Sequence, residues 1–138
     1  MAVHGGELRL QTRGDGEIVD LTEGVARVAA AGDIDRGIVC VSAVGSTVAV
    51  TTMEYEAGGI QDLTEVLERL VPREGAYAHN RLNHDTNAHA HIRAALIGPS
   101  ITVPLVSGRL VLGTWQQIVL VDFDDRPRQR TVTVQIVG

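Results

Sequence analysis

Histidine side chains gather in one short part of this chain. His79, His84, His89 and His91 fall within thirteen residues and are four of the five histidines in the 138-residue sequence. Imidazole titrates near neutral pH and is the commonest metal ligand in proteins, so a cluster of this kind suits either zinc coordination or acid–base chemistry. The window that begins at His79 and ends just after Trp115, the only tryptophan, is therefore where we expect a site.

The residues after Thr86 are predicted to form a helix from Asn87 to Ile97, with Gly98-Pro99 as its stop. Two residues apart on a helix, His89 and His91 point about 200° away from each other and do not face one ion. Small residues on the His91 side favour close packing there. We therefore expect His91 to point inward to the site and His89 to lie at its rim.

A metal site needs more ligands than this helix supplies, because zinc normally takes at least three from the protein. No HExxH or CxxC motif is present. His79 lies in a predicted loop, residues 77–86, that is able to fold back over the start of the helix, where Asp85 or Glu54 supplies an oxygen. We expect His79 and His91 to bind a divalent ion such as zinc. The alternative is that each histidine only forms hydrogen bonds; no role is assigned to His84.

The start of the same helix also suits an anion, since its free backbone N–H groups attract negative charge. Asp85 and Asn87 flank that start. Arg93 lies about one turn further along the helix, where its guanidinium could bind a phosphate. Ser100 is either a turn residue or a second contact to the anion. These residues are candidates for binding a small phosphorylated ligand.

The scarce aromatic residues give a further candidate, because only four occur in the chain. Trp115 follows Gly113-Thr114 and precedes Gln116. Either Trp115 fills the aliphatic core, or Trp115 and Gln116 form a binding wall or a subunit interface.

Composition excludes several classes of protein. The formal net charge of -5 gives no electrostatic case for binding nucleic acid. Arg126, Arg128 and Arg130 alternate along a strand-like run beside three aspartates, so we expect a solvated face. The single cysteine, Cys40, excludes an intrachain disulfide and is expected to be buried. No apolar run reaches the length of a membrane span, and we expect a soluble, cytoplasmic protein.

Apolar periodicity predicts an α+β fold in a single compact domain covering residues 1–138. The run 37–44 is almost wholly apolar and is predicted to be a central strand covered on both faces. Two or three helices among seven or eight mostly antiparallel strands are expected. The predicted helices are 21–31, 60–71 and 87–97, and the predicted strands are 7–12, 18–19, 37–44, 46–52, 101–106, 109–112, 115–123 and 128–137.

Several segments resemble the YjbQ family, also called UPF0047. The residues that carry the resemblance are Asp85-x-Asn87-Ala88-His89-Ala90-His91-Ile92, Leu96-Ile97-Gly98-Pro99-Ser100, Pro104, Gly108, Leu112-Gly113-Thr114-Trp115-Gln116 and Arg126-Pro127-Arg128-x-Arg130. Glu54, Asp62 and Pro72 also stand where the upstream half of that family would have them.

The resemblance implies an α+β subunit, a homotrimer and a histidine-bearing site near the subunit boundary that is associated with metal. The activity linked to the family is secondary thiamine-phosphate synthesis, in which a pyrimidine diphosphate and a thiazole phosphate join and pyrophosphate is released. Three characteristic histidines correspond to His79, His91 and a position in a His-Thr/Ser-Thr motif, which here reads Gly45-Ser46-Thr47. Because one histidine is missing, we expect weak metal binding and weak activity.

Two hypotheses of different classes follow. In the first, the protein is a synthase in which a divalent ion or Arg93 stabilises the leaving pyrophosphate, while His79 and His91 bind the ion or transfer protons. In the second, the trimer binds a small anionic metabolite or a metal ion without turnover. The glycine at position 45, where the family has a histidine, favours this second hypothesis. The catalytic candidates are His91, Asp85 and Arg93; the ligand-binding candidates are Asn87, Ser100, Trp115, Gln116 and Glu54; and the metal-binding candidates are His79 and His91.

Overall fold

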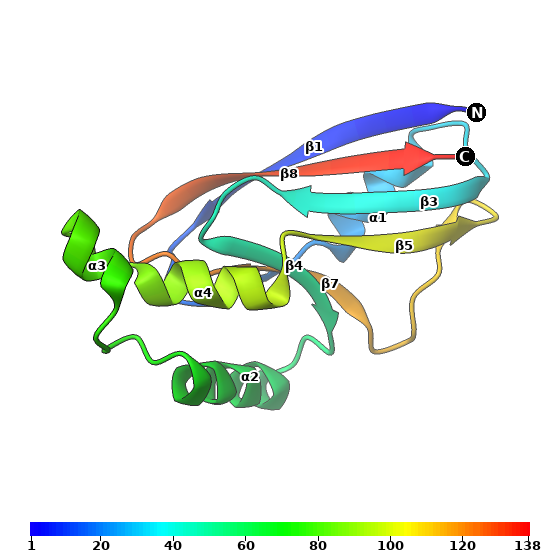
Figure 1. Cartoon of the computed structure of the whole chain (residues 1–138). Helices are drawn as coiled ribbons and strands as arrows, with labels where there is room; N and C mark the ends of the chain where they lie inside the picture. Colours follow the sequence, from blue (N-terminus) through cyan, green and yellow to red (C-terminus); the bar gives the residue numbers. More distant parts are fainter.

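The computed structural model describes all 138 residues as two antiparallel β-sheets with four helices (Figure 1). The five-stranded sheet has the order β1-β8-β3-β5-β6, and the three-stranded sheet has the order β2-β7-β4. The α+β class is confirmed. In chain order the elements are β1 (Val3–Thr12), β2 (Glu17–Asp20), α1 (Thr22–Ala30), β3 (Arg36–Ala43), β4 (Val48–Met53), α2 (Ala57–Leu70), α3 (Ala78–Asn83), α4 (Ala88–Ile97), β5 (Ser100–Val106), β6 (Arg109–Leu110), β7 (Gln117–Asp122) and β8 (Arg128–Val137).

The three-stranded sheet is the middle layer of the molecule. Successive side chains of a strand point to opposite faces, and on β7 both sets are buried. Ile118 and Leu120 join one apolar cluster with the five-stranded sheet and α1. Val119 and Val121 join a second cluster with α2 and α4. The two helices therefore cover one face of this sheet while the larger sheet covers the other (Figure 1).

Strand β3 is central in its sheet, as predicted, but only one of its faces is covered. Val39 and Val41 are fully buried, whereas the side chain of Ile38 is 51% exposed. The prediction that this strand is covered on both faces is wrong. The doubly covered strands are β4 and β7, whose β-branched runs look much like that of β3 in the sequence.

The predicted helices around α1, α2 and α4 are confirmed to within a few residues. The prediction of a loop over residues 77–86 is wrong, because Ala78–Asn83 forms α3 and His84 ends it in the left-handed conformation, with φ of 52°. None of the residues of α3 is buried, so the segment shows no apolar period to detect. No helix of the chain is long and apolar enough to cross a membrane.

The expectation that the three C-terminal arginines form a solvated face holds for Arg126 alone. The Arg130 side chain is 8% exposed. Its Nε donates to Oδ2 of Asp122 at 2.7 Å, and its Nη2 donates to Oδ1 of Asp122 at 3.0 Å and to Oγ1 of Thr47 at 2.7 Å. Arg128 Nε donates to Oδ2 of Asp124 at 2.6 Å. We call Asp122, Asp124, Arg128 and Arg130 the buried ion network.

The carboxylates of this network are held in their charged form. Burial raises the pKa of Asp122, but hydrogen bonds from Arg130 and Thr12 outweigh it, so the pKa lies below its ordinary value. The pKa of Asp124 is lowered in the same way, with Arg128 as the main donor against burial. Each buried charge thus has an opposite charge beside it.

Removing one charged residue from such a network leaves its partner buried without a counter-charge. Arg130→Ala leaves Asp122 buried without its counter-charge, so we expect it to lower the free energy of unfolding by about 3–5 kcal/mol. Arg126→Ala is the matched control, because Arg126 is exposed and surface changes cost less than about 0.5 kcal/mol. Urea denaturation of both variants measures the difference, and similar small losses in the two would contradict the structural role given to Arg130.

Candidate functional site

Helices α3 and α4 bring together the two histidines that the sequence analysis paired. The ring centroids of His79 and His91 lie 4.7 Å apart, with the rings packed edge to face at 62°. His79 stands in the first turn of α3 and His91 in the first turn of α4. The chain reverses at His84 between the two helices, which is why residues twelve positions apart meet.

Each ring has one nitrogen that faces an oxygen acceptor. Nε2 of His79 is 3.1 Å from Oδ1 of Asn87 and 3.6 Å from Oδ2 of Asp85. Nδ1 of His91 is 3.1 Å from the carbonyl oxygen of Ser46. Because a carbonyl or amide oxygen accepts and does not donate, these two nitrogens carry the protons. In the neutral rings, the free lone pairs are then on Nδ1 of His79 and Nε2 of His91.

Asn87 occupies the N-cap position of α4 but makes no cap hydrogen bond, because its side chain is used by His79. Oδ1 of Asn80 accepts from the backbone N–H of Ala88 at 3.0 Å and takes over that function. Asn80 was not among the sequence candidates. The only signal in the sequence that could have identified Asn80 is its position next to His79.

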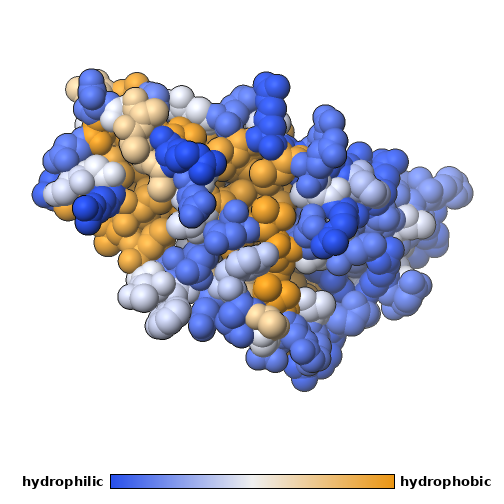
Figure 2. All heavy atoms as spheres, turned by 180° about the vertical axis from the view of Figure 1, so that it is seen from behind, coloured by the Kyte–Doolittle hydropathy of each residue, from blue (hydrophilic) through white to orange (hydrophobic).

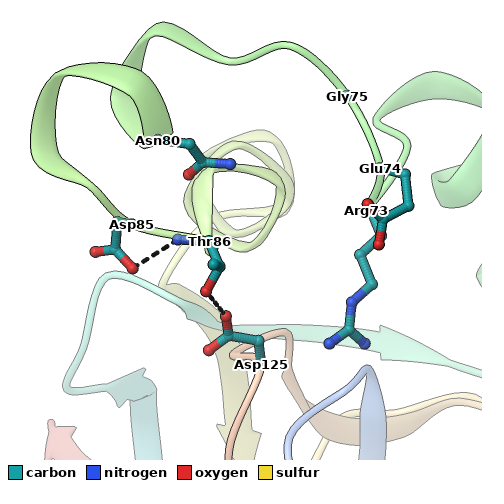
Figure 3. A pocket seen from close by; sticks show the side chains of 7 residues that line it. All are labelled: Arg73, Glu74, Gly75, Asn80, Asp85, Thr86 and Asp125. Carbon is teal, nitrogen blue, oxygen red and sulfur yellow. Dashed lines mark hydrogen bonds between the residues drawn. The ribbon is translucent and has the colours of Figure 1, made fainter.

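A cavity of about 360 Å³ opens beside Asp85, between α3, the start of α4 and the segment after α2 (Figure 3). Oδ1 of Asp85 accepts from the backbone N–H of Thr86 at 2.8 Å, and the Thr86 hydroxyl donates to Asp125. Figure 3 shows Arg73 across the cavity from these residues. The lining is wholly non-hydrophobic and consists of Arg73, Glu74, Gly75, Asn80, Asp85, Thr86 and Asp125.

This acidic cavity, as we call it, does not suit an anion. Glu74, Asp85 and Asp125 give it three carboxyl groups against the single guanidinium of Arg73. Arg73 is in addition paired with Asp15 at 2.5 Å. Except for Asp85, the charged residues of this cavity were missed in the sequence, because they come from separate loops and follow no common spacing.

The expectation that His91 points inward and His89 lies at the rim is wrong. His89 is 2% exposed, and its Nδ1 is buried without a hydrogen-bond partner, whereas His91 is only partly buried. Burial lowers the pKa of His89, and the positive charges of Arg93 and Arg73 lower it further. The inward face of α4 is set by Ala90 and Ala94, which pack on the middle sheet.

Arg93 ties α4 to the end of α2. Its Nε and Nη2 donate to the carbonyl oxygen of Val71 at 3.0 and 2.7 Å, and Nη2 also donates to Glu68 at 2.7 Å. Its guanidinium hydrogen bond lowers the pKa of Glu68. Two residues from His91 on the helix, Arg93 points about 200° away from it. The structure does not bring Arg93 to the histidine pair.

The other candidates lie apart from the pair within one chain. Glu54 and Gln116 stand at the far end of β4 from Ser46, and the six residues of that strand span roughly 20 Å. Nε2 of Gln116 donates to Oγ1 of Thr52 at 3.1 Å. Trp115 is 70% exposed, so it does not fill the core. Ser100 is exposed at the start of β5 and pairs with Ser42.

Within one chain, the residues around the histidine pair do not supply a complete set of metal ligands. No group of three or more His, Cys, Asp or Glu side chains is arranged to hold an ion. His79 and His91 supply two imidazoles, and the nearest carboxylate, Asp85, faces the same nitrogen of His79 that is hydrogen-bonded to Asn87. At Gly45 there is no side chain to supply a third nitrogen. Zinc normally takes three or four protein ligands, so the set falls short.

Comparison with known proteins places the chain in a family. The model of the UPF0047 protein YjbQ-like family matches residues 6–138. A UPF0047 protein of Archaeoglobus fulgidus is 43% identical over 129 residues, which cover 94% of this chain and 98% of the relative. A UPF0047 protein of Methanothermobacter thermautotrophicus is 38% identical over 138 residues, which cover 100% of this chain and 94% of the relative.

Solved structures agree. A YbjQ-like protein of unknown function from Sulfolobus solfataricus superposes with a TM-score of 0.94 at 32% identity, covering 99% of this chain and 98% of that one. A hypothetical protein from Aeropyrum pernix gives a TM-score of 0.89 at 34% identity, covering 97% and 98%. The resemblance seen in the sequence is thereby confirmed: the chain belongs to the UPF0047, or YjbQ-like, family.

Proposed function

We propose that this chain binds a small phosphorylated or anionic ligand at the pair His79 and His91, and that its thiamine-phosphate synthase activity is weak or absent. The observation that supports this most is the contact of the two imidazoles at 4.7 Å, on partly buried side chains beside the segment Gly45–Thr47. An imidazole that takes up a proton becomes a cation with two N–H donors, which suits an anionic oxygen.

The same geometry argues against efficient synthesis. Release of pyrophosphate needs positive charge at the leaving group in the transition state. Arg93 is engaged with Glu68 and Val71, and position 45 has no side chain. Of the groups assigned to the synthase hypothesis, only His79, His91 and Asp85 stand together, and Asp85 is negative.

We therefore expect the synthase activity of the wild type to be no higher than that of a variant that lacks one of the two histidines. When a pyrimidine diphosphate and a thiazole phosphate are mixed with the protein, product should form no faster with the wild type than with His91→Ala. Chromatographic detection of the thiamine phosphate measures both rates. A wild-type rate clearly above that of the variant would refute the proposal of a weak or absent synthase.

A weak divalent-cation site is the second candidate, favoured by the same close pair of imidazoles. In a calorimetric titration with zinc, we expect weak binding by the wild type, because water must replace the missing ligand. His79→Ala should abolish that binding. His84→Ala is the matched control, since His84 is an exposed histidine on the same segment, and it should leave binding unchanged. Tight binding of one full ion per subunit would contradict this expectation.

The proposal includes a homotrimer. Trp115, Val111 and Ile38 are 70%, 53% and 51% exposed, which is costly for a lone subunit. Seen from behind, the molecule has hydrophobic surface gathered on the half away from α3 (Figure 2). A groove between α1 and β6 is lined by Ala26, Ala29, Ala30, Leu110 and Leu112.

Light scattering tests the trimer directly. At micromolar concentration we expect the mass of three 14.7 kDa chains, the number that the resemblance to the YjbQ family implies. Trp115→Ala should weaken the assembly, while Arg126→Ala, which removes an exposed polar side chain, should not. A stable monomer of the wild type would count decisively against the trimer.

A further inference from the structure

The guanidinium of Arg130 has one nitrogen that the protein does not use. Nε and Nη2 are committed to Asp122 and Thr47, and Nη2 also lies 3.7 Å from Asp124. Nη1 has no hydrogen-bond partner among these groups. His89 Nδ1 is the only buried side-chain nitrogen or oxygen without a partner, so Nη1 of Arg130 is not sealed from solvent. A fixed cation thus keeps one N–H₂ group without a protein partner.

Gly45 lies directly against this group. A Cβ atom built on Gly45 would lie 2.7 Å from Nη1 of Arg130 and 3.0 Å from Cγ1 of Val48. The glycine itself is exposed and has φ of 146°, a conformation that other residues rarely adopt. At Gly98, where φ is 101°, a Cβ would meet nothing within 4 Å. Gly45 therefore differs from such a turn glycine, because a side chain at position 45 would collide with the charged group of Arg130.

The Arg130 guanidinium lies against the same short segment as His91. Nη2 of Arg130 donates to the Thr47 hydroxyl, and Nδ1 of His91 donates to the Ser46 carbonyl oxygen. Ser46 is exposed, so its hydroxyl is available to a ligand. Gly45 and Thr47 thus lie against the guanidinium of Arg130, and Ser46 between them carries a hydroxyl and the carbonyl oxygen that accepts from His91.

This set of groups selects an oxyanion. A guanidinium N–H donates a charge-assisted hydrogen bond to a phosphate oxygen, and a hydroxyl donates a second. A divalent cation would instead be repelled by Arg130. On the other side of the histidine pair, Asp85 and the acidic cavity repel a phosphate. The charges on the two sides therefore decide which end of the site a phosphate occupies.

We propose that Gly45 opens a phosphate-binding position in which Nη1 of Arg130 donates a hydrogen bond to a phosphate oxygen of the ligand, next to Ser46 and His91. The inference rests on the proposed function, because it assigns the anionic end of the ligand bound at the histidine pair. It makes Arg130 a binding residue as well as a structural one.

Calorimetric titration with inorganic phosphate tests the proposal. The wild type should bind phosphate, and Gly45→Ala should bind at least tenfold more weakly, because its methyl group covers or displaces Nη1. Gly98→Ala is the matched control, since it imposes a similar backbone strain with no atom in its way, and it should bind as the wild type does. Thermal melting of both variants confirms that they are folded.

Ser46→Asp provides a second test that does not depend on strain at position 45. A carboxylate there neutralises the guanidinium and repels the anion, so phosphate binding should be lost. Ser107→Asp, which adds the same charge at the exposed turn between β5 and β6, should have no effect.

The two proposals fail in different ways. If His91→Ala loses phosphate binding while Gly45→Ala and Ser46→Asp keep it, the phosphate position at Arg130 is wrong and the histidine site stands. If the wild type binds no phosphate at all, both the phosphate position and the proposed function are overturned.

Discussion

The ion pair between Arg130 and Asp122 is the contact on which the geometry of the site depends. Arg130 belongs to β8 in the larger sheet and Asp122 to β7 in the middle sheet, so the pair joins the two layers. The same guanidinium holds Thr47, where the chain crosses from β3 to β4. A buried pair of this kind adds little stability relative to apolar side chains, but breaking it is costly. Its effect here is to fix the segment that carries Gly45 and the carbonyl contact to His91.

The histidine pair stands at a boundary between regions of opposite charge. His79 faces Asp85 and the acidic cavity, while His91 faces Ser46 and the segment beside Arg130. On a chain with a formal net charge of -5, few positions are electrostatically favourable for binding an anion. We propose the guanidinium of Arg130 as one such place, because its buried partners already fix its orientation. This is why we propose that the two imidazoles bind an anion.

Elements with a regular apolar period were predicted well from the sequence, and most contacts between distant residues were not. Helix α2 and strand β8 follow their apolar residues closely. The pairing of His79 with His91 was also predicted, although His79 lies on helix α3 and not on the loop that was expected to fold back. The inward face of α4 was assigned wrongly. Packing against α2 and β4 determines which face points inward, and this packing cannot be read from the sequence of α4 alone. Arg130 looked like a surface residue, since nothing in an alternating run of arginines reveals that Asp122 lies opposite.

Nuclear magnetic resonance of arginine-labelled protein, titrated with inorganic phosphate, tests the central claim most directly. Asp122 and Thr47 restrict rotation of the Arg130 guanidinium, so its Nη1 and Nη2 protons should give separate signals. We expect phosphate to shift the Nη1 signals of Arg130 and the ring signals of His91, and to leave the exposed Arg126 unchanged. If His91 responds while Arg130 does not, or if neither responds, the account of this site is wrong.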